Sequence, residues 1–149
     1  MYVSIGCGSG ICGLISVRDA LGVKTEIVGV VSANANCYAR SFQERRPIET
    51  ETAVTLADGM AVRVPVPAAL EVIWRGAGAV VEVSDDEVAA AIRAYYTDTH
   101  NLAEGAGAAP LAALLKNPRR VGKKVGVILC GGNIDRDVFL RIMNGGAGA

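Results

Sequence analysis

The feature that most constrains the fold is a run of small residues, 6–10, that separates a short apolar segment from a helical one. Residues 1–5 are apolar and stop at the glycines, which is typical of a buried strand. Over residues 11–21 apolar side chains recur at helical spacing, and Gly22 follows as a helix stop signal. A glycine-rich loop between a strand and a helix offers free backbone N–H groups and the positive end of the helix dipole, so it predicts a phosphate site.

The alternation of strand and helix continues along the chain. Residues 26–31 and 79–83 are rich in β-branched side chains and are predicted as buried strands, and residues 124–129 as a fourth. Ser84 and Glu87 have the spacing of a capping box at the start of a helix. The other assignments are helices at 34–45, 68–76, 84–98 and 107–116, mainly loop at 49–64, and a frayed tail at 144–149. This order predicts an α/β fold with a mostly parallel sheet flanked by helices, without a domain boundary between residues 1 and 149.

Composition excludes several classes of partner. Fifteen basic residues balance fifteen acidic ones and aromatic residues make up only 5%, so we expect no nucleic acid and no charge-driven binding to a membrane surface. No apolar run reaches the roughly 20 residues of a membrane helix, and residues 1–6 lack the basic segment of a signal peptide. A cytoplasmic location is therefore expected.

The cysteines show no metal-binding or disulfide pattern. Cys7, Cys12, Cys37 and Cys130 include no C-x-x-C pair, and His100 is the single histidine. We therefore expect reduced thiols, no zinc site and a solvent-facing His100 at a helix end.

The glycine-rich loop by itself leaves three interpretations open. Residues 8–13 read GSGICG, which satisfies the G-x-G-x-x-G pattern of a dinucleotide site between a strand and a helix. Such a site also needs an acidic residue near the end of the second strand to bind the ribose, and residues 30–33 read VVSA. A dinucleotide, another phosphate ligand and a turn without a ligand all remain possible from the loop alone.

Six short motifs follow one another along the chain. They are IGCGSGICG at 5–13, IVGVVSANA at 27–35, LADGMAV at 56–62, VSDDEV at 83–88, EGAGAA at 104–109 and VILCGGNID at 127–135. In this order they resemble the C-terminal portion of the threonine dehydratase (threonine/serine ammonia-lyase) family, pyridoxal-phosphate (PLP)-dependent enzymes of the tryptophan-synthase-β-like fold. The resemblance implies part of the large, cofactor-binding domain of that fold. In a complete enzyme it implies β-elimination of a hydroxy amino acid to a 2-oxo acid and ammonia.

The resemblance also implies a set of cofactor contacts. The implied cofactor-binding residues are Gly6, Cys7, Gly8, Ser9, Gly10, Gly59, Glu104 and Cys130. The loop amides would bind the phosphate of PLP, or a free phosphate or sulfate ion, and Gly59 would present a carbonyl to the cofactor. Glu104 would lie near the ring and Cys130 would meet the pyridine nitrogen. A thiol there leaves the nitrogen largely unprotonated, which suits elimination.

Two features of the family are missing from the sequence. The carboxylates that bind a divalent cation in some relatives would fall at Val31 and Cys37, so no metal site is expected. The family's Schiff-base lysine lies in an S-F-K-x-R-G-like motif upstream of the glycine loop, together with a small domain. None of the lysines has that context; they are Lys24, Lys116, Lys123 and Lys124. We therefore expect that the lysine segment and the small domain lie outside these 149 residues and that this chain alone is inactive.

Three alternatives to an ammonia-lyase portion are retained. They are a non-catalytic PLP- or phosphate-binding fragment or split-enzyme subunit, a Rossmann-type dinucleotide module, and another PLP enzyme of this fold such as a racemase or a β-replacement enzyme. The expected partners are an amino acid substrate in the full enzyme, and either a second copy of the chain or the missing N-terminal half. Absence of that half would expose apolar surface and so favour association.

Overall fold

The structure is a computed structural model that describes residues 1–117 and 124–146. Its strands are β1 (Tyr2–Ser4), β2 (Val28–Ser32) and β3 (Ala79–Val83). Its helical elements are α1 (Ser9–Ala20), α2 (Cys37–Glu44), η1 (Asp58–Met60), α3 (Pro67–Gly76), α4 (Asp85–Ala94), η2 (Tyr95–Thr99), α5 (Gly105–Leu115) and α6 (Arg136–Met143). Lys123 and the end of the predicted frayed tail, 147–149, lie outside the described residues.

The three strands form a parallel sheet in the order β1-β2-β3, which confirms the predicted α/β class. All five residues of β2, the central strand, are buried. The segment predicted as a fourth strand, 124–129, contributes one isolated parallel bridge between Val127 and Tyr2. The Tyr2 N–H donates to Gly126 O at 2.9 Å and the Ile128 N–H donates to Tyr2 O at 3.1 Å. β1 is only three residues long, so it offers too little edge for a longer ladder, and the strand prediction was too long.

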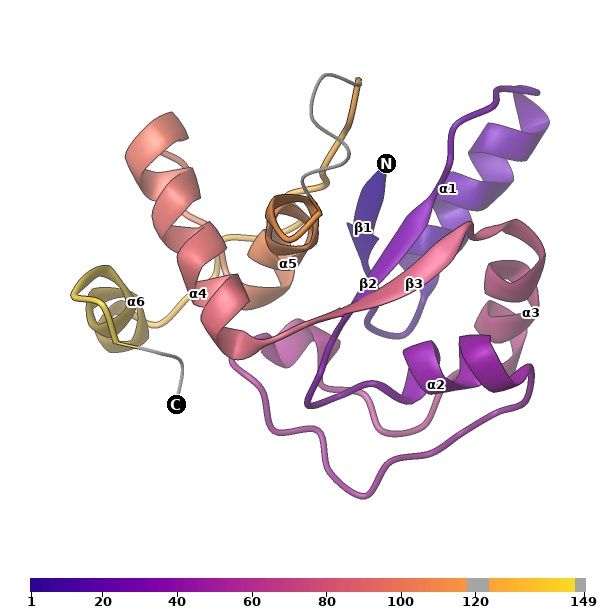
Figure 1. The fold of residues 1–149 in the computed structure, drawn as a ribbon, viewed down its shortest axis with the longest axis horizontal. Helices are drawn as coiled ribbons and strands as arrows, with labels where there is room; N and C mark the ends of the chain where they lie inside the picture. The colour runs from indigo at the N-terminus through magenta and orange to yellow at the C-terminus, as the bar shows by residue number, and fades with distance from the viewer. Residues whose placement is uncertain (118–123, 147–149) are drawn as a thin grey trace.

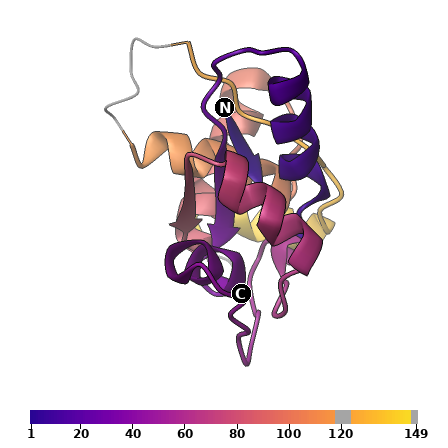
Figure 2. The same ribbon diagram turned by 90° about the vertical axis from the view of Figure 1, so that its right-hand side faces the viewer.

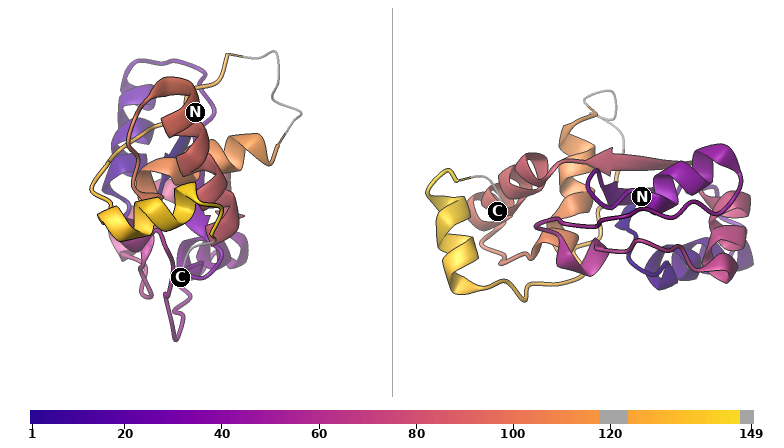
Figure 3. Two further views of the ribbon diagram at one scale, coloured as in Figure 1. Left: turned by 90° about the vertical axis from the view of Figure 1, so that its left-hand side faces the viewer. Right: turned by 90° about the horizontal axis from the view of Figure 1, so that it is seen from below.

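Helices cover both faces of the sheet, as Figure 1 shows. Contacts connect α1 with β1 and α3, and α2 with α3 and β3, so these helices form one layer; Figure 2 shows α1 and α3 in front of the strands. On the other face α5 contacts all three strands and α4 packs on α5. Helix α6 packs on α4 and lies at the far end of the molecule from α1–α3 (Figure 3). The result is a layered α/β/α arrangement.

Gly29, the second residue of β2, leaves space in which the two ends of the glycine-rich loop meet. A Cβ atom on Gly29 would lie 2.5 Å from Ile5 Cδ1 and 3.0 Å from Ile11 Cδ1. Ile5 precedes the loop, Ile11 follows it, and both side chains are buried. The space left by the missing Gly29 side chain is thus filled from both flanks of the loop.

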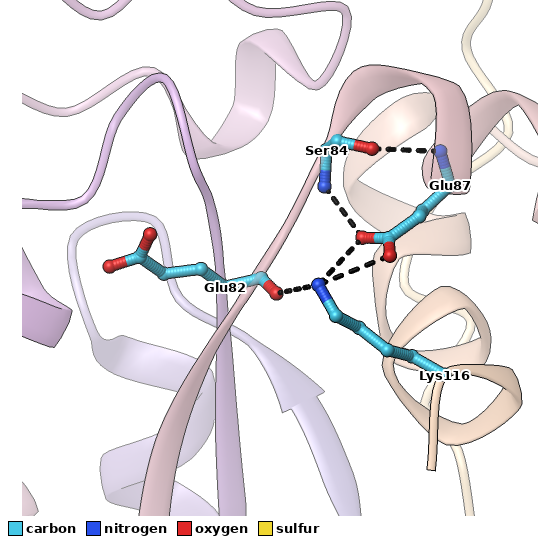
Figure 4. Close-up of polar contacts among 4 residues, drawn as sticks. All are labelled: Glu82, Ser84, Glu87 and Lys116. Carbon is cyan, nitrogen blue, oxygen red and sulfur yellow. Dashed lines mark hydrogen bonds and ion pairs between the residues drawn. The ribbon is translucent and has the colours of Figure 1, made fainter. Parts of the chain in front are cut away.

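The predicted capping box at the start of α4 is confirmed. Ser84 Oγ accepts the Glu87 N–H at 3.2 Å, and Glu87 Oε2 accepts the Ser84 N–H at 2.9 Å. Lys116, just after α5, donates to Glu82 O at 3.3 Å and pairs with the Glu87 carboxylate at 3.1 Å (Figure 4). One carboxylate therefore caps α4 and also connects it with the end of α5.

Several helix boundaries differ from the predicted ones. Helix α2 begins at Cys37, three residues later than predicted, because Ser32 holds the preceding residues in a turn through bonds to the N–H groups of Asn34 and Ala35. The helix that begins at Asp85 ends at Ala94 and continues as the π-helical turn η2, after which His100 is exposed with a left-handed φ of 55°. Helix α6 was not predicted at all. No helix among the described residues has the length and apolar character needed to cross a membrane.

Candidate cofactor site

One cavity of about 590 Å³ lies at the carboxyl end of β1 and the amino end of α1. The structure brings all eight predicted site residues into its lining; they are Gly6, Cys7, Gly8, Ser9, Gly10, Gly59, Glu104 and Cys130. The remaining lining residues are Val3, Ser4, Leu14, Ala106 and Ile128. Ligands of open α/β sheets bind at this edge, because parallel strands there direct their following loops to one place. The roles of the eight residues in binding stay a prediction, but their proximity is a feature of the fold.

The loop from Gly6 to Gly10 presents unused hydrogen-bond donors to this cavity. Within the described part of the chain, no backbone N–H from Gly6 to Ile11 donates a hydrogen bond to another residue. Gly8 takes a φ of +96°, a conformation that glycine adopts without a steric cost. The positive end of the α1 dipole adds to these donors, so the loop has the chemistry of an anion site.

The Gly59 segment approaches the loop from another wall of the cavity. A Cβ atom on Gly6 would lie 2.5 Å from Gly59 O, so the two backbones touch because neither residue has a side chain. The segment is anchored behind the cavity by Asp85, the first residue of α4. Asp85 accepts the Thr55 hydroxyl at 2.5 Å and the Leu56 N–H at 3.1 Å.

Cys130 lies on the same edge of the sheet as the loop, as the sequence predicts. Its Sγ is 3.4 Å from the hydroxyl of Ser4, the last residue of β1, and either atom can be the donor. Sequence reasoning missed Ser4. The signal for it was its place at the carboxyl end of a strand that leads directly into the glycine-rich loop.

Glu104 forms the third side of the cavity at the start of α5. Its N–H donates to Gly131 O at 3.1 Å, and its Oε2 accepts the Asn133 N–H at 3.0 Å. The Glu104 carboxylate is therefore not directed only to solvent. Glu104 fixes the backbone that follows Cys130.

The four free cysteines divide into two pairs. Cys7 and Cys130 are exposed and line the cavity. Cys37 is buried and its thiol donates to Val62 O at 3.2 Å, while the Cys12 thiol donates to Ala69 O at 3.6 Å on α3. Burial raises the pKa of both Cys12 and Cys37, so these two thiols stay protonated and serve packing.

The described part of this cavity is lined by no lysine and holds no cluster of three metal-ligating side chains. Lys116 is engaged by Glu82 and Glu87, whereas Lys24 and Lys124 line a different cavity at the start of the strands. Val31 is a buried core residue. Over residues 1–117 and 124–146, no three histidine, cysteine, aspartate or glutamate side chains come together as a candidate metal group.

Comparison with known proteins decides the family. The model of the pyridoxal-phosphate-dependent enzyme family matches residues 1–131. The chain belongs to this family. Because the enzymes of this family depend on pyridoxal phosphate, the match displaces the dinucleotide interpretation of residues 8–13.

Two similar proteins are L-threonine ammonia-lyases. It is 33% identical over 146 residues to an L-threonine ammonia-lyase of Thermotoga maritima, covering 98% of this chain and 36% of that protein. It is 40% identical over 139 residues to an L-threonine ammonia-lyase of Geobacter sulfurreducens, covering 91% and 34%. The chain thus spans about a third of the length of these relatives.

Solved structures agree on the fold. A threonine deaminase from T.th. superposes with a TM-score of 0.85 at 28% identity, over 90% of this chain and 49% of that one. The serine racemase of Dictyostelium discoideum superposes with a TM-score of 0.79 at 26% identity, over 90% and 43%. The expected fold class, an α/β arrangement like that of threonine-dehydratase-like PLP enzymes, is therefore confirmed.

The residues of the cavity fit the cofactor of this family. A row of unpartnered amides at a helix start suits a doubly charged phosphate group. Small loop residues let that group approach the backbone closely, and the thiol of Cys130 lines the same cavity.

Proposed function

We propose that this chain is the PLP-binding portion of an ammonia-lyase that acts on a small hydroxy amino acid such as threonine or serine. The observation that carries the proposal is that one cavity joins the unpartnered amides of residues 6–10 with Gly59, Glu104 and Cys130. When bound, PLP supplies an electron-withdrawing ring that makes the Cα proton of the amino acid removable.

Each wall of the cavity has a separate task in this proposal. The N–H groups of the loop and the α1 dipole bind the phosphate and so fix one end of the cofactor. Cys130 would hold the ring nitrogen through its thiol, which Ser4 orients from 3.4 Å. Glu104 holds the Asn133 N–H, which keeps the backbone after Cys130 in place.

The described lining of the cavity contains no lysine that could carry the cofactor and remove the Cα proton of the substrate. We infer that a lysine from a further segment, positioned over the cavity, carries the cofactor and takes this proton. Association with that segment, or of two copies of the chain, follows from the same proposal.

Racemisation is the second candidate function. The serine racemase of Dictyostelium discoideum is nearly as similar to this chain as the T.th. threonine deaminase, at 26% against 28% identity. Both reactions begin with removal of the Cα proton, so the cavity walls described above would serve either. A complex that converts L-serine to D-serine without producing 2-oxo acid would favour the racemase.

Ligand binding by the purified 149-residue chain tests the proposal. In calorimetric titrations we expect inorganic phosphate and PLP to bind competitively and NAD not to bind. Alkylation of the two exposed thiols adds a position-specific measurement: PLP should protect both Cys7 and Cys130, whereas phosphate should leave Cys130 reactive. Cys37 is the internal control, since its buried thiol stays unreactive throughout. Binding of NAD in place of PLP would overturn the proposal.

A further inference from the structure

Tyr38, on α2, is a buried tyrosine that touches the glycine-rich loop from outside the cavity. Only 1% of its surface is exposed. Its hydroxyl donates to Cys7 O at 2.9 Å and accepts the Val66 N–H, just before α3, at 3.0 Å. One hydroxyl therefore connects the loop with α2 and with the start of α3, two of the helices that cover this face of the sheet.

The direction of these two bonds is fixed by their chemistry. The Val66 N–H can only donate, so the Tyr38 oxygen accepts it and the hydroxyl proton is left for the Cys7 carbonyl. Burial raises the pKa of Tyr38, so the hydroxyl remains a donor at neutral pH.

The bond to Cys7 O sets the orientation of a neighbouring donor. In a trans peptide the C=O and the N–H point in opposite directions, and no described peptide bond here is cis. Holding the Cys7 carbonyl toward Tyr38 therefore turns the N–H of Gly8, which belongs to the same peptide unit, away from α2. Gly8 lines the cavity, and its N–H has no partner among the described residues.

We propose that Tyr38 is a positioning residue of the anion site: through the Cys7 carbonyl it aims the Gly8 N–H at the phosphate group of the ligand. This inference rests on the proposed phosphate site. Tyr38 is thereby added to the residues of the site, although it does not touch the ligand and acts only through the peptide unit between Cys7 and Gly8.

The test compares Tyr38→Phe with Ser41→Ala in the full 149-residue chain, with inorganic phosphate as the probe. Ser41 lies on the same helix, is fully buried, and bonds only to Ile48 through its hydroxyl, accepting the N–H at 2.8 Å and donating to the O at 3.4 Å. Both variants lose stability. We expect the phosphate Kd, measured well below each variant's Tm, to rise about tenfold or more in Tyr38→Phe and to stay unchanged in Ser41→Ala.

The outcomes separate the two proposals. If the unmodified chain binds neither phosphate nor PLP, the proposed function fails and the role of Tyr38 falls with it. If the unmodified chain and Tyr38→Phe bind phosphate equally well, only the role of Tyr38 is overturned. Should Tyr38→Phe not fold, a phosphate titration of the unmodified chain followed by ¹⁵N NMR decides: a shift of the Gly8 amide signal supports the proposal, and an unmoved Gly8 signal overturns it.

Discussion

Several single residues of this chain determine how closely backbone groups approach one another and in which direction their N–H and C=O groups point. Gly8 has a φ of +96°, and a Cβ atom there would lie 2.6 Å from the Ala69 Cβ on α3. Ala69 is buried and cannot move outward without shifting its helix. The loop therefore tolerates no side chain at this position, whereas Ser9 and Cys7 keep theirs.

Gly8→Ala should weaken phosphate binding by at least about tenfold, because the loop must change shape to escape both the strain and the collision. The matched control is Gly22→Ala, which also has a positive φ of +63° but meets nothing within 4 Å and lies at the other end of α1. Both substitutions should cost on the order of 1–2 kcal/mol of backbone strain. Calorimetry with phosphate distinguishes them, and equal phosphate affinity of the two variants would contradict the loop geometry.

The grouping of the eight cavity residues could be predicted because the order of the sequence motifs resembles that of a known PLP-dependent family. Ser4 and Tyr38 could not. Ser4 belongs to a strand, and nothing in its local sequence distinguishes its side chain from those of other strand residues. Its partner Cys130 is 126 residues away in sequence. Tyr38 acts through a carbonyl on another element, and no local pattern reveals such a contact.

At the scale of elements, local signals determined where most strands and helices lie, and tertiary contacts determined their ends. β3 was predicted with its observed bounds, and the capping box at Ser84 is present. The strand predicted at 124–129 shortened to one bridge because its neighbour β1 is short. Helix α6 was missed because its short amphipathic stretch of eight residues follows a glycine-rich break.

The cap of α4 gives a prediction at this scale. Ser84→Ala removes the side chain that accepts the Glu87 N–H and should lower the free energy of unfolding by about 1 kcal/mol. Lys116→Met removes an ion pair whose lysine side chain is 54% exposed, and should cost less, about 0–1 kcal/mol. Urea denaturation in low and high salt measures both. The Lys116 effect should shrink with salt, and a larger loss from Lys116→Met than from Ser84→Ala would contradict the assignment.

At the scale of the whole molecule, the chain covers about a third of the L-threonine ammonia-lyases that it resembles. The described lining of its cavity carries unpartnered amides, two thiols and a carboxylate but no lysine. The cofactor-binding and proton-transfer parts of the proposed site would thus belong to different segments.

We expect no 2-oxo acid from threonine or serine when the purified 149-residue chain is supplied with PLP. Adding the upstream portion of the Thermotoga maritima L-threonine ammonia-lyase should restore measurable activity if the two parts fold together. The measurement is 2-oxo acid formation in protein free of host enzyme, against a blank with PLP alone. Activity of the chain by itself above that blank would show that a residue of these 149 supplies the base.

The packing of Ile5 and Ile11 over Gly29 has a thermodynamic consequence for the loop between them. Both ends of a five-residue segment are held at one point of the central strand, so the segment has few conformations left once the sheet has formed. The entropy of ordering the loop is then lost during folding and not during ligand binding. A phosphate group arriving at this edge of the sheet would meet donors that are already aligned, and the loop should have the same shape with and without it.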